Sequence, residues 1–125
     1  MSFEAVIAEE TILSNSMLVQ ANFKNSKLKN VNFNNSDLTG AFFQNTDFHN
    51  VSFKNSILVG ADFSGSNVTI HDLEKAQSLY AAMLPVKVDL ELKQIRPDLF
   101  NKRIISYQDS FINLILEKHS KHIFK

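Results

Sequence analysis

The sequence lacks cysteine altogether, and it lacks any excess of charge of one sign. The missing cysteine excludes disulfides, thiolate catalysis and cysteine metal sites, and it fits a reducing compartment, so we expect a cytoplasmic protein. Lysine plus arginine (13) balance aspartate plus glutamate (13), so no overall field draws the chain toward nucleic acid or an anionic membrane. The sequence therefore predicts no membrane insertion and does not favour direct nucleic-acid binding.

Long apolar runs are also missing. The longest, such as residues 111–116, fall far short of the ~20 residues that a membrane helix needs. The first ten residues carry Glu4, Glu9 and Glu10 where a secretory signal would have a basic start and an apolar run, so we interpret them as mature sequence. With 44% hydrophobic residues in 125, the chain has the composition of one globular domain.

No catalytic pattern is present. Nucleophile elbows, phosphate-binding loops, dinucleotide fingerprints and zinc-protease helices are all absent from the sequence. We therefore predict that the chain is not an enzyme, that it has no catalytic or metal site, and that it takes no cofactor and no small-molecule substrate.

What the sequence does contain is a repeat of five residues that holds its register from Thr11 to Ile70. The third residue of each pentad is always apolar, and the first is always small or β-branched. The third-position residues are Leu13, Leu18, Phe23, Leu28, Phe33, Leu38, Phe43, Phe48, Phe53, Leu58, Phe63 and Val68. A period of five matches neither a helix nor a flat strand, so the backbone must turn every five residues.

A second period of twenty residues indicates how the pentads stack. Ala21, Ala41 and Ala61 recur at that spacing, and so do the leucines at 18, 38 and 58 and the phenylalanines at 23, 43 and 63. Four pentads therefore make one coil, and like residues stack above one another along a solenoid axis. Third-position side chains fill the interior, and small first-position side chains fit beside them.

Pentads such as Ala-Asp-Phe-Ser-Gly (61–65) and Ser-Asp-Leu-Thr-Gly (36–40) resemble the consensus of the pentapeptide-repeat family. The resemblance covers residues 11–70 and implies a mainly β fold: a right-handed quadrilateral β-helix of about three coils. We expect residues 1–10 to begin a partial coil or to fold over the first coil as a cap, and 71–125 to form a helical C-terminal cap and extension.

The C-terminal part changes to helical spacing. Residues 70–85 predict a helix, 86–88 a short extended piece and 89–95 a weaker helix. A stronger helix is predicted from Pro97 to about Lys118, with an apolar stripe that must be buried.

Outward positions of the repeat suggest an interaction surface. Met17, Val19, Ile57 and Val59 lie on the pentads that begin with serine, and Phe42 points outward on the next face. Exposed apolar surface marks a contact, so we expect either the 97–118 helix or a second copy of the chain to cover these residues.

Other polar residues have simpler interpretations. The asparagines that end most pentads are turn residues rather than a sugar- or ice-binding array. His119 and His122 are spaced to ligate a metal, but we interpret them as part of a basic tail because a third ligand is missing.

Two functions remain open at this point. The sequence favours a non-catalytic scaffold that binds a protein partner, and it leaves open whether the helical tail forms a homodimer or packs on the solenoid. The alternative implied by the family resemblance is a mimic of duplex DNA that binds DNA gyrase or topoisomerase. That activity needs an acidic surface, whereas the repeat holds four lysines against three aspartates.

Overall fold

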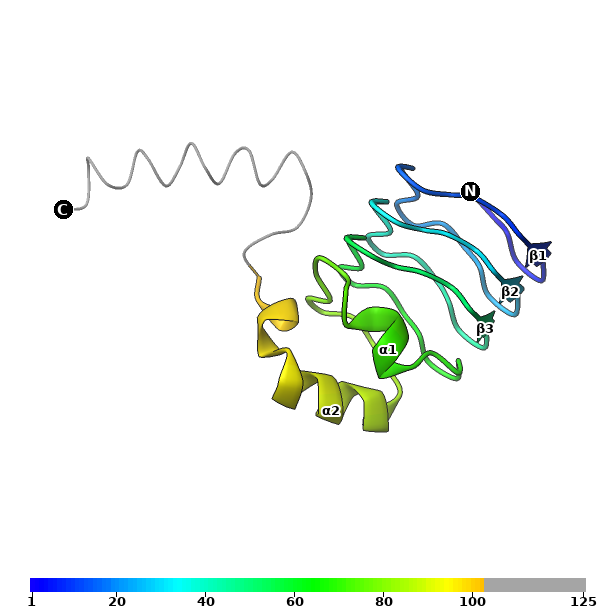
Figure 1. Ribbon diagram of the computed structural model, residues 1–125. Helices are drawn as coiled ribbons and strands as arrows, with labels where there is room; N and C mark the ends of the chain where they lie inside the picture. Colours follow the sequence, from blue (N-terminus) through cyan, green and yellow to red (C-terminus); the bar gives the residue numbers. More distant parts are fainter. Residues whose placement is uncertain (103–125) are drawn as a thin grey trace, which may run out of the picture.

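Residues 1–102 of the chain are described by a computed structural model, in which the backbone winds into a stack of coils (Figure 1). Three short strands, β1 (Ile7–Glu9), β2 (Lys27–Lys29) and β3 (Asp47–His49), form a parallel sheet in the order β1-β2-β3. Their register pairs Ile7 with Lys27 and Lys27 with Asp47. Isolated bridges elsewhere in the first three coils keep the same spacing. Each coil therefore takes twenty residues, as the sequence predicted.

The backbone turns at the fifth residue of every pentad. Positive φ angles occur there from Ala5 to Gly65, at values between 53° and 71°. Asparagine holds this left-handed conformation at lower cost than most residues, and glycine holds it freely. Four such turns in each coil give the stack its four sides, and they confirm that the asparagines are turn residues.

This turn chemistry predicts the effect of a substitution at Asn35, whose φ is 59° and whose side chain is exposed. Asn35→Ala should lower the free energy of unfolding by about 1 kcal/mol, because the alanine Cβ lies too close to the backbone carbonyl in the left-handed conformation. Asn35→Gly should stay within about 0.5 kcal/mol of the native protein. Urea unfolding checks both, and equal losses for the two variants would contradict the interpretation.

Third-position side chains fill the interior, as predicted. Five phenylalanines are fully buried: Phe23, Phe33, Phe43, Phe53 and Phe63. They stack in columns along the axis. In one column the ring centroids of Phe3, Phe23, Phe43 and Phe63 follow one another at 4.7, 5.0 and 5.0 Å, with rings nearly parallel. Aromatic contacts of this kind add to the stability gained from burial.

Serine and threonine in the first position have a role that the sequence pattern did not show. The hydroxyls of Ser26, Ser36 and Thr46 donate to the carbonyl oxygens of the residues 23 positions earlier, at 2.6–2.7 Å. The Ser26 and Ser36 hydroxyls also accept from the N–H groups of Val6 and Ser16. These buried hydroxyls are thus satisfied by the preceding coil, which ties neighbouring coils together.

The β-helix extends beyond residues 11–70 at both ends, and at the N-terminal end this confirms the alternative in which residues 1–10 begin a coil. Residues 1–10 pair with the second coil through the Ser2–Asn22 bridge and through β1, so they belong to the first coil and form no separate cap. The coils are residues 1–20, 21–40, 41–60 and 61–81, which makes four rather than about three.

The prediction of a helix over 70–85 was wrong. Only α1 (Ile70–Leu73) is helical, with Thr69 and Asp72 forming a capping box at its start. The chain then resumes the coil, and Leu73 and Leu79 enter the core. Backbone bonds from Gln77 to Ser56 and from Leu58 to Ser78 rejoin the ladder, with one extra residue at 77–78. Pairing with the third coil satisfies this backbone and buries both leucines, which an isolated helix would not achieve.

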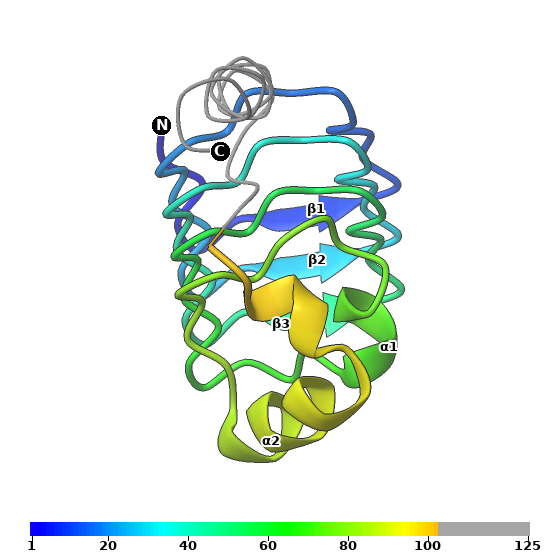
Figure 2. The same ribbon diagram turned by 90° about the vertical axis from the view of Figure 1, so that its left-hand side faces the viewer.

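A second helix closes the far end of the stack (Figures 1 and 2). This helix, α2 (Val86–Ile95), includes residues 86–88, which were predicted to be extended, and the 89–95 segment that was predicted to be helical. Leu92 of α2 is fully buried against the core. The stack is therefore covered at its C-terminal end.

A short 3₁₀ helix, η1 (Pro97–Phe100), follows α2. Its Leu99 is buried, and its carbonyl oxygen accepts from Leu79 N–H at 2.7 Å. The predicted helix from 97 therefore starts as a 3₁₀ turn, and its remainder lies outside the described residues.

Candidate interaction surface

The serine face, formed by the pentads that begin at Ser16, Ser36 and Ser56, carries four of the five residues of the predicted interaction surface. Met17 is 74% exposed and Val19 is 45% exposed, so these two are accessible. Asp37 pairs with Met17 on one side and with Ile57 on the other. Thr39 bonds to the Asp37 carboxylate at 2.6 Å, so a polar pair separates the two ends of the face. The predicted patch is not continuous.

Ile57 corrects the prediction most clearly, because only 6% of it is exposed, and Val59 is half-buried. Ile57 lies beside Ser78 of the fourth coil, which is itself buried. Leu79, next to Ser78, is bonded to Leu99 of η1, so both the fourth coil and η1 lie at this edge of the face. The sequence analysis ended the repeat at residue 70, so it placed no coil next to Ile57 that could cover this side chain.

The two predicted occupants of this face were the helix over 97–118 and a second copy of the chain. Most of that helix lies outside the described residues 1–102. Within the described part, η1 reaches the fourth coil, where its Leu99 carbonyl oxygen accepts from Leu79 N–H.

Phe42 lies on the alanine face, formed by the pentads that begin at Ala21, Ala41 and Ala61. Its neighbours in adjacent coils are Asn22 and Asp62, both polar, and 42% of Phe42 is exposed. Successive side chains in an extended segment point to opposite sides, and Phe43 already fills the interior. Phe42 must therefore stay outside, as the sequence predicted, held on a rigid ladder.

The first coil presents an apolar surface that the sequence reasoning missed. Ile7 is 72% exposed and Ile12 is 75% exposed, and Met1, Met17 and Val19 join them. Asn22, Lys27, Asn32 and Asp37 hold the matching second positions of the next coil. The signal was present as apolar residues in the second position of consecutive pentads, but the repeat was taken to begin only at residue 11.

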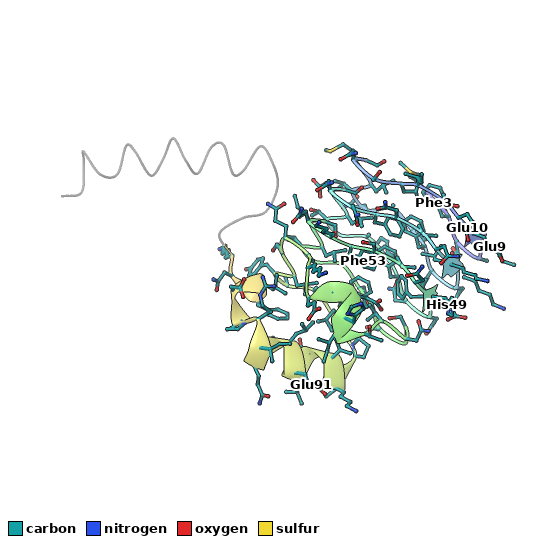
Figure 3. All side chains as sticks on the ribbon, viewed as in Figure 1. Phe3, Glu9, Glu10, His49, Phe53 and Glu91 are labelled. Carbon is teal, nitrogen blue, oxygen red and sulfur yellow. The ribbon has the colours of Figure 1, made fainter. Side chains whose placement is uncertain are left out.

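A shallow, open depression of about 320 Å³ lies along β1, β2 and β3. Its charged lining residues are Glu9, Lys27, Lys29 and Asp47, with His49 beside them. Figure 3 shows Glu9, Glu10 and His49 on this side of the stack. Acidic and basic side chains alternate from coil to coil here, which suits neither a polyanion nor a single cation.

Arg96 fixes the junction between α2 and η1. Its guanidinium donates to both carboxylate oxygens of Asp98, at 3.0 and 2.8 Å, and to the carbonyl oxygen of Glu74 at 2.6 Å. The hydrogen bonds from Arg96 hold the pKa of the exposed Asp98 below its usual range, and Asp98 in turn raises the pKa of Arg96. This arrangement is structural, and it joins the closing segment to the fourth coil.

Within residues 1–102, no cluster of three or more histidine, aspartate or glutamate side chains is placed to hold a metal ion. His71 is exposed beside Glu74, at 3.7 Å, at the end of α1. The His119 and His122 pair lies outside the described residues.

A comparison with protein-family profiles matches the chain to the family described as pentapeptide repeats. Eight copies of the repeat are found, over residues 2–35, 9–45 and 32–69, which together span more than half of the chain. This chain belongs to the pentapeptide-repeat family. The match begins at residue 2, in agreement with the pairing of residues 1–10 in the first coil.

The solved structures include a pentapeptide-repeat protein similar to this one. One is a pentapeptide repeat protein from the thylakoid lumen of Arabidopsis thaliana, with 21% sequence identity and a TM-score of 0.48. The similarity covers 74% of this chain and 77% of that protein. A comparison with curated protein sequences finds no match. None of the helices of this pentapeptide-repeat protein within residues 1–102 has the length and apolar character of a bilayer-spanning segment.

Proposed function

We propose that this pentapeptide-repeat protein is a non-catalytic interaction module, a rigid scaffold that displays side chains to a protein partner. The observation that carries the proposal is Phe42, an aromatic side chain left 42% exposed on a face whose neighbouring positions are polar. Rigid, partly exposed aromatic residues are frequent energetic centres of protein interfaces. The stacked rings behind Phe42 hold its backbone in place, so little conformational freedom is lost when a partner binds.

The proposal is tested by photocrosslinking in cells that naturally produce the protein. Benzoylphenylalanine at position 42 should yield a discrete adduct with one partner protein. The same group at Ser52, on the opposite side of the stack, is the matched control and should yield none. Identical adducts from both positions, or none from position 42, would contradict the proposal that Phe42 lies in a partner-binding surface.

A quantitative prediction accompanies this test. Phe42→Ser should weaken binding of the captured partner about tenfold, because truncating a central aromatic residue typically costs more than 1 kcal/mol. The free energy of unfolding should change by less than about 0.5 kcal/mol, since Phe42 lies outside the core. Loss of binding together with a large loss of stability would indicate a structural role instead.

A homodimer through residues beyond 102 is part of the proposal, because the sequence there has an apolar stripe that must be buried. Light scattering coupled to size-exclusion chromatography measures this directly. A mass of twice 14.2 kDa is expected, and a strict monomer would remove the dimer from the proposal.

The alternative of a DNA mimic that binds gyrase or topoisomerase has no specific observation in its favour. Lys24, Lys27 and Lys29 lie in the second coil, between the acidic first coil and the mixed third coil. A duplex mimic needs a continuous negative surface. We expect gyrase supercoiling in the presence of a quinolone to be unchanged by saturating protein, and protection of the enzyme would restore this alternative.

A further inference from the structure

The first coil exposes one edge of the β-helix. In the second and third coils, the N–H of each second-position residue donates to the coil before it: Asn22 to Met1, Lys27 to Val6, Asn32 to Thr11 and Asp37 to Ser16. The corresponding N–H groups of Ser2, Ile7, Ile12 and Met17 face the side where residues 1–102 supply no further coil. An unpaired edge of this kind is a template for pairing with another extended segment.

Apolar side chains surround the same edge. Ile7 and Ile12 are about three-quarters exposed, as is Met17, and they project from three successive sides of the first coil. Phe3 and Leu13, at the end of the core, are only partly buried although they pack against it. An occupant that covered this edge would therefore bury apolar surface as well as pair its backbone.

The charge of the first coil restricts the occupant. Residues 1–20 contain Glu4, Glu9 and Glu10 and no lysine, arginine or histidine. The coil that does pack against it brings Lys24, Lys27 and Lys29, and Lys29 lies in register with Glu9. The neighbour already in place thus has the complementary sign, and a second neighbour on the open side would meet the same acidic side chains.

A second copy of the chain fits this edge poorly. Joining two first coils would bring three glutamates from each copy to one junction with no basic side chain to offset them. The other end of the stack offers no open coil within the described residues, because α2 covers it and buries Leu92 there. Neither pairing of like ends nor head-to-tail stacking is therefore favoured.

We propose that the first coil is a docking edge for an extended, basic segment of a partner protein, which adds to the β-helix as a further strand. Its backbone pairs with the N–H groups of Ile7, Ile12 or Met17, and its apolar side chains cover the end of the core at Phe3, Ala8 and Leu13. On its outward face, the methylene groups of its basic side chains pack on the isoleucines. Its lysine or arginine side chains meet Glu4, Glu9 and Glu10. This inference rests on the proposed function, since it names a surface and a partner chemistry for the interaction module.

The test uses the full chain and a fluorescent heptapeptide of alternating lysine and valine, blocked at both ends. Fluorescence anisotropy should show saturable binding, about tenfold tighter than that of the same peptide with glutamate in place of lysine. N-methylation of alternate residues places methyl groups on the backbone edge of the peptide, which blocks its pairing as a strand, and should weaken binding by a similar factor. Equal binding of the three peptides, or none at millimolar concentration, would overturn the proposal.

Protein variants locate the binding. The double variant Ile7→Asn with Ile12→Asn, in which the second change copies the asparagine at the equivalent position 32, should weaken binding of the lysine peptide about tenfold. Leu90→Asn, an exposed position on α2, is the matched control and should bind as the native protein does. Unchanged binding by the double variant would contradict docking on the first coil.

Two further outcomes separate this inference from its alternatives. Residues 103–125 are themselves apolar and carry four basic against two acidic side chains. If Lys118→Gln, Lys121→Gln and Lys125→Gln together raise the affinity for the peptide about tenfold, the edge belongs to the chain's own tail, and the partner assignment is overturned. A partner captured at Phe42 in the absence of peptide binding would likewise overturn the docking edge while the proposed function stands.

Discussion

Phe43→Ala should lower the free energy of unfolding by about 3–5 kcal/mol, the largest loss we expect from a single truncation. Phe43 is fully buried, and its ring lies 5.0 Å from both Phe23 and Phe63 in the same column. It also contacts the rings of Phe33 and Phe53, at 5.8 and 5.7 Å. Backbone hydrogen bonds between coils hold Phe23, Phe33 and Phe63, so the surrounding side chains cannot move far enough to fill the cavity.

Urea unfolding followed by circular dichroism measures the effect of Phe43→Ala, with Lys54→Ala as the control. Lys54 is exposed in the third coil, and its truncation should change the free energy of unfolding by less than about 0.5 kcal/mol. The comparison requires that the free energy of unfolding falls with urea concentration at the same slope in both variants. Similar midpoints for both would mean that Phe43 does not fill the interior.

Leu92→Ala should have the second-largest effect, a loss of about 2–5 kcal/mol. Leu92 is fully buried where α2 closes the C-terminal end of the stack. Its removal leaves a cavity under the cap and loosens the contact between α2 and the fourth coil. The Leu79 N–H, which donates to Leu99, should then exchange with solvent faster than N–H groups of the second coil.

Leu90→Ala is the matched control for Leu92→Ala, because it makes the same change on the same helix at a position that is 61% exposed. Any difference in helix propensity cancels between the two variants. Leu90→Ala should therefore stay within about 0.5 kcal/mol of the native protein. A loss as large as that of Leu92→Ala would show that α2 closes the stack through another face.

The repeat could be predicted from the sequence because its geometry leaves few choices. Phenylalanine or leucine every fifth residue can reach one interior only if the chain turns at each pentad, and Asn35, Asn45 and Asn55 tolerate the φ that such turns require. The twenty-residue recurrence of Ala21, Ala41 and Ala61 then set the length of a coil. The turn at each pentad and the length of a coil both follow from residue size and backbone preference at single positions, which can be read from the sequence.

The fourth coil could not be predicted in the same way. Leu73, Ala76 and Leu79 follow one another at intervals of three, which suits one side of a helix as well as it suits a coil with an extra residue. The turn at Ala81 has a φ of 60° without the asparagine or glycine that marks the other corners. Pairing with the third coil favours a further coil over a helix in this segment. That pairing joins residues about twenty positions apart, so local sequence patterns do not reveal it.

The candidate surface was predicted only in part for the same reason. Outward orientation follows from position in the pentad, so Met17, Val19 and Phe42 were placed correctly on the outside. Burial of Ile57 depends on the fourth coil, which the sequence reasoning did not place there. The apolar surface of the first coil was overlooked because the regular repeat was counted only from residue 11, although residues 1–10 were allowed to begin a coil.

Excimer fluorescence tests most directly whether residues twenty apart stack while residues ten apart lie on opposite sides. The chain has no cysteine, so pyrene can be attached to introduced cysteines alone. Lys27→Cys with Asp47→Cys places two labels on paired, exposed positions of β2 and β3, roughly 4.8 Å apart in the backbone, and should give strong excimer emission. Lys27→Cys with Asp37→Cys should give none. Stronger emission from the second pair than from the first, as a continuous helix would produce, would contradict the β-helix.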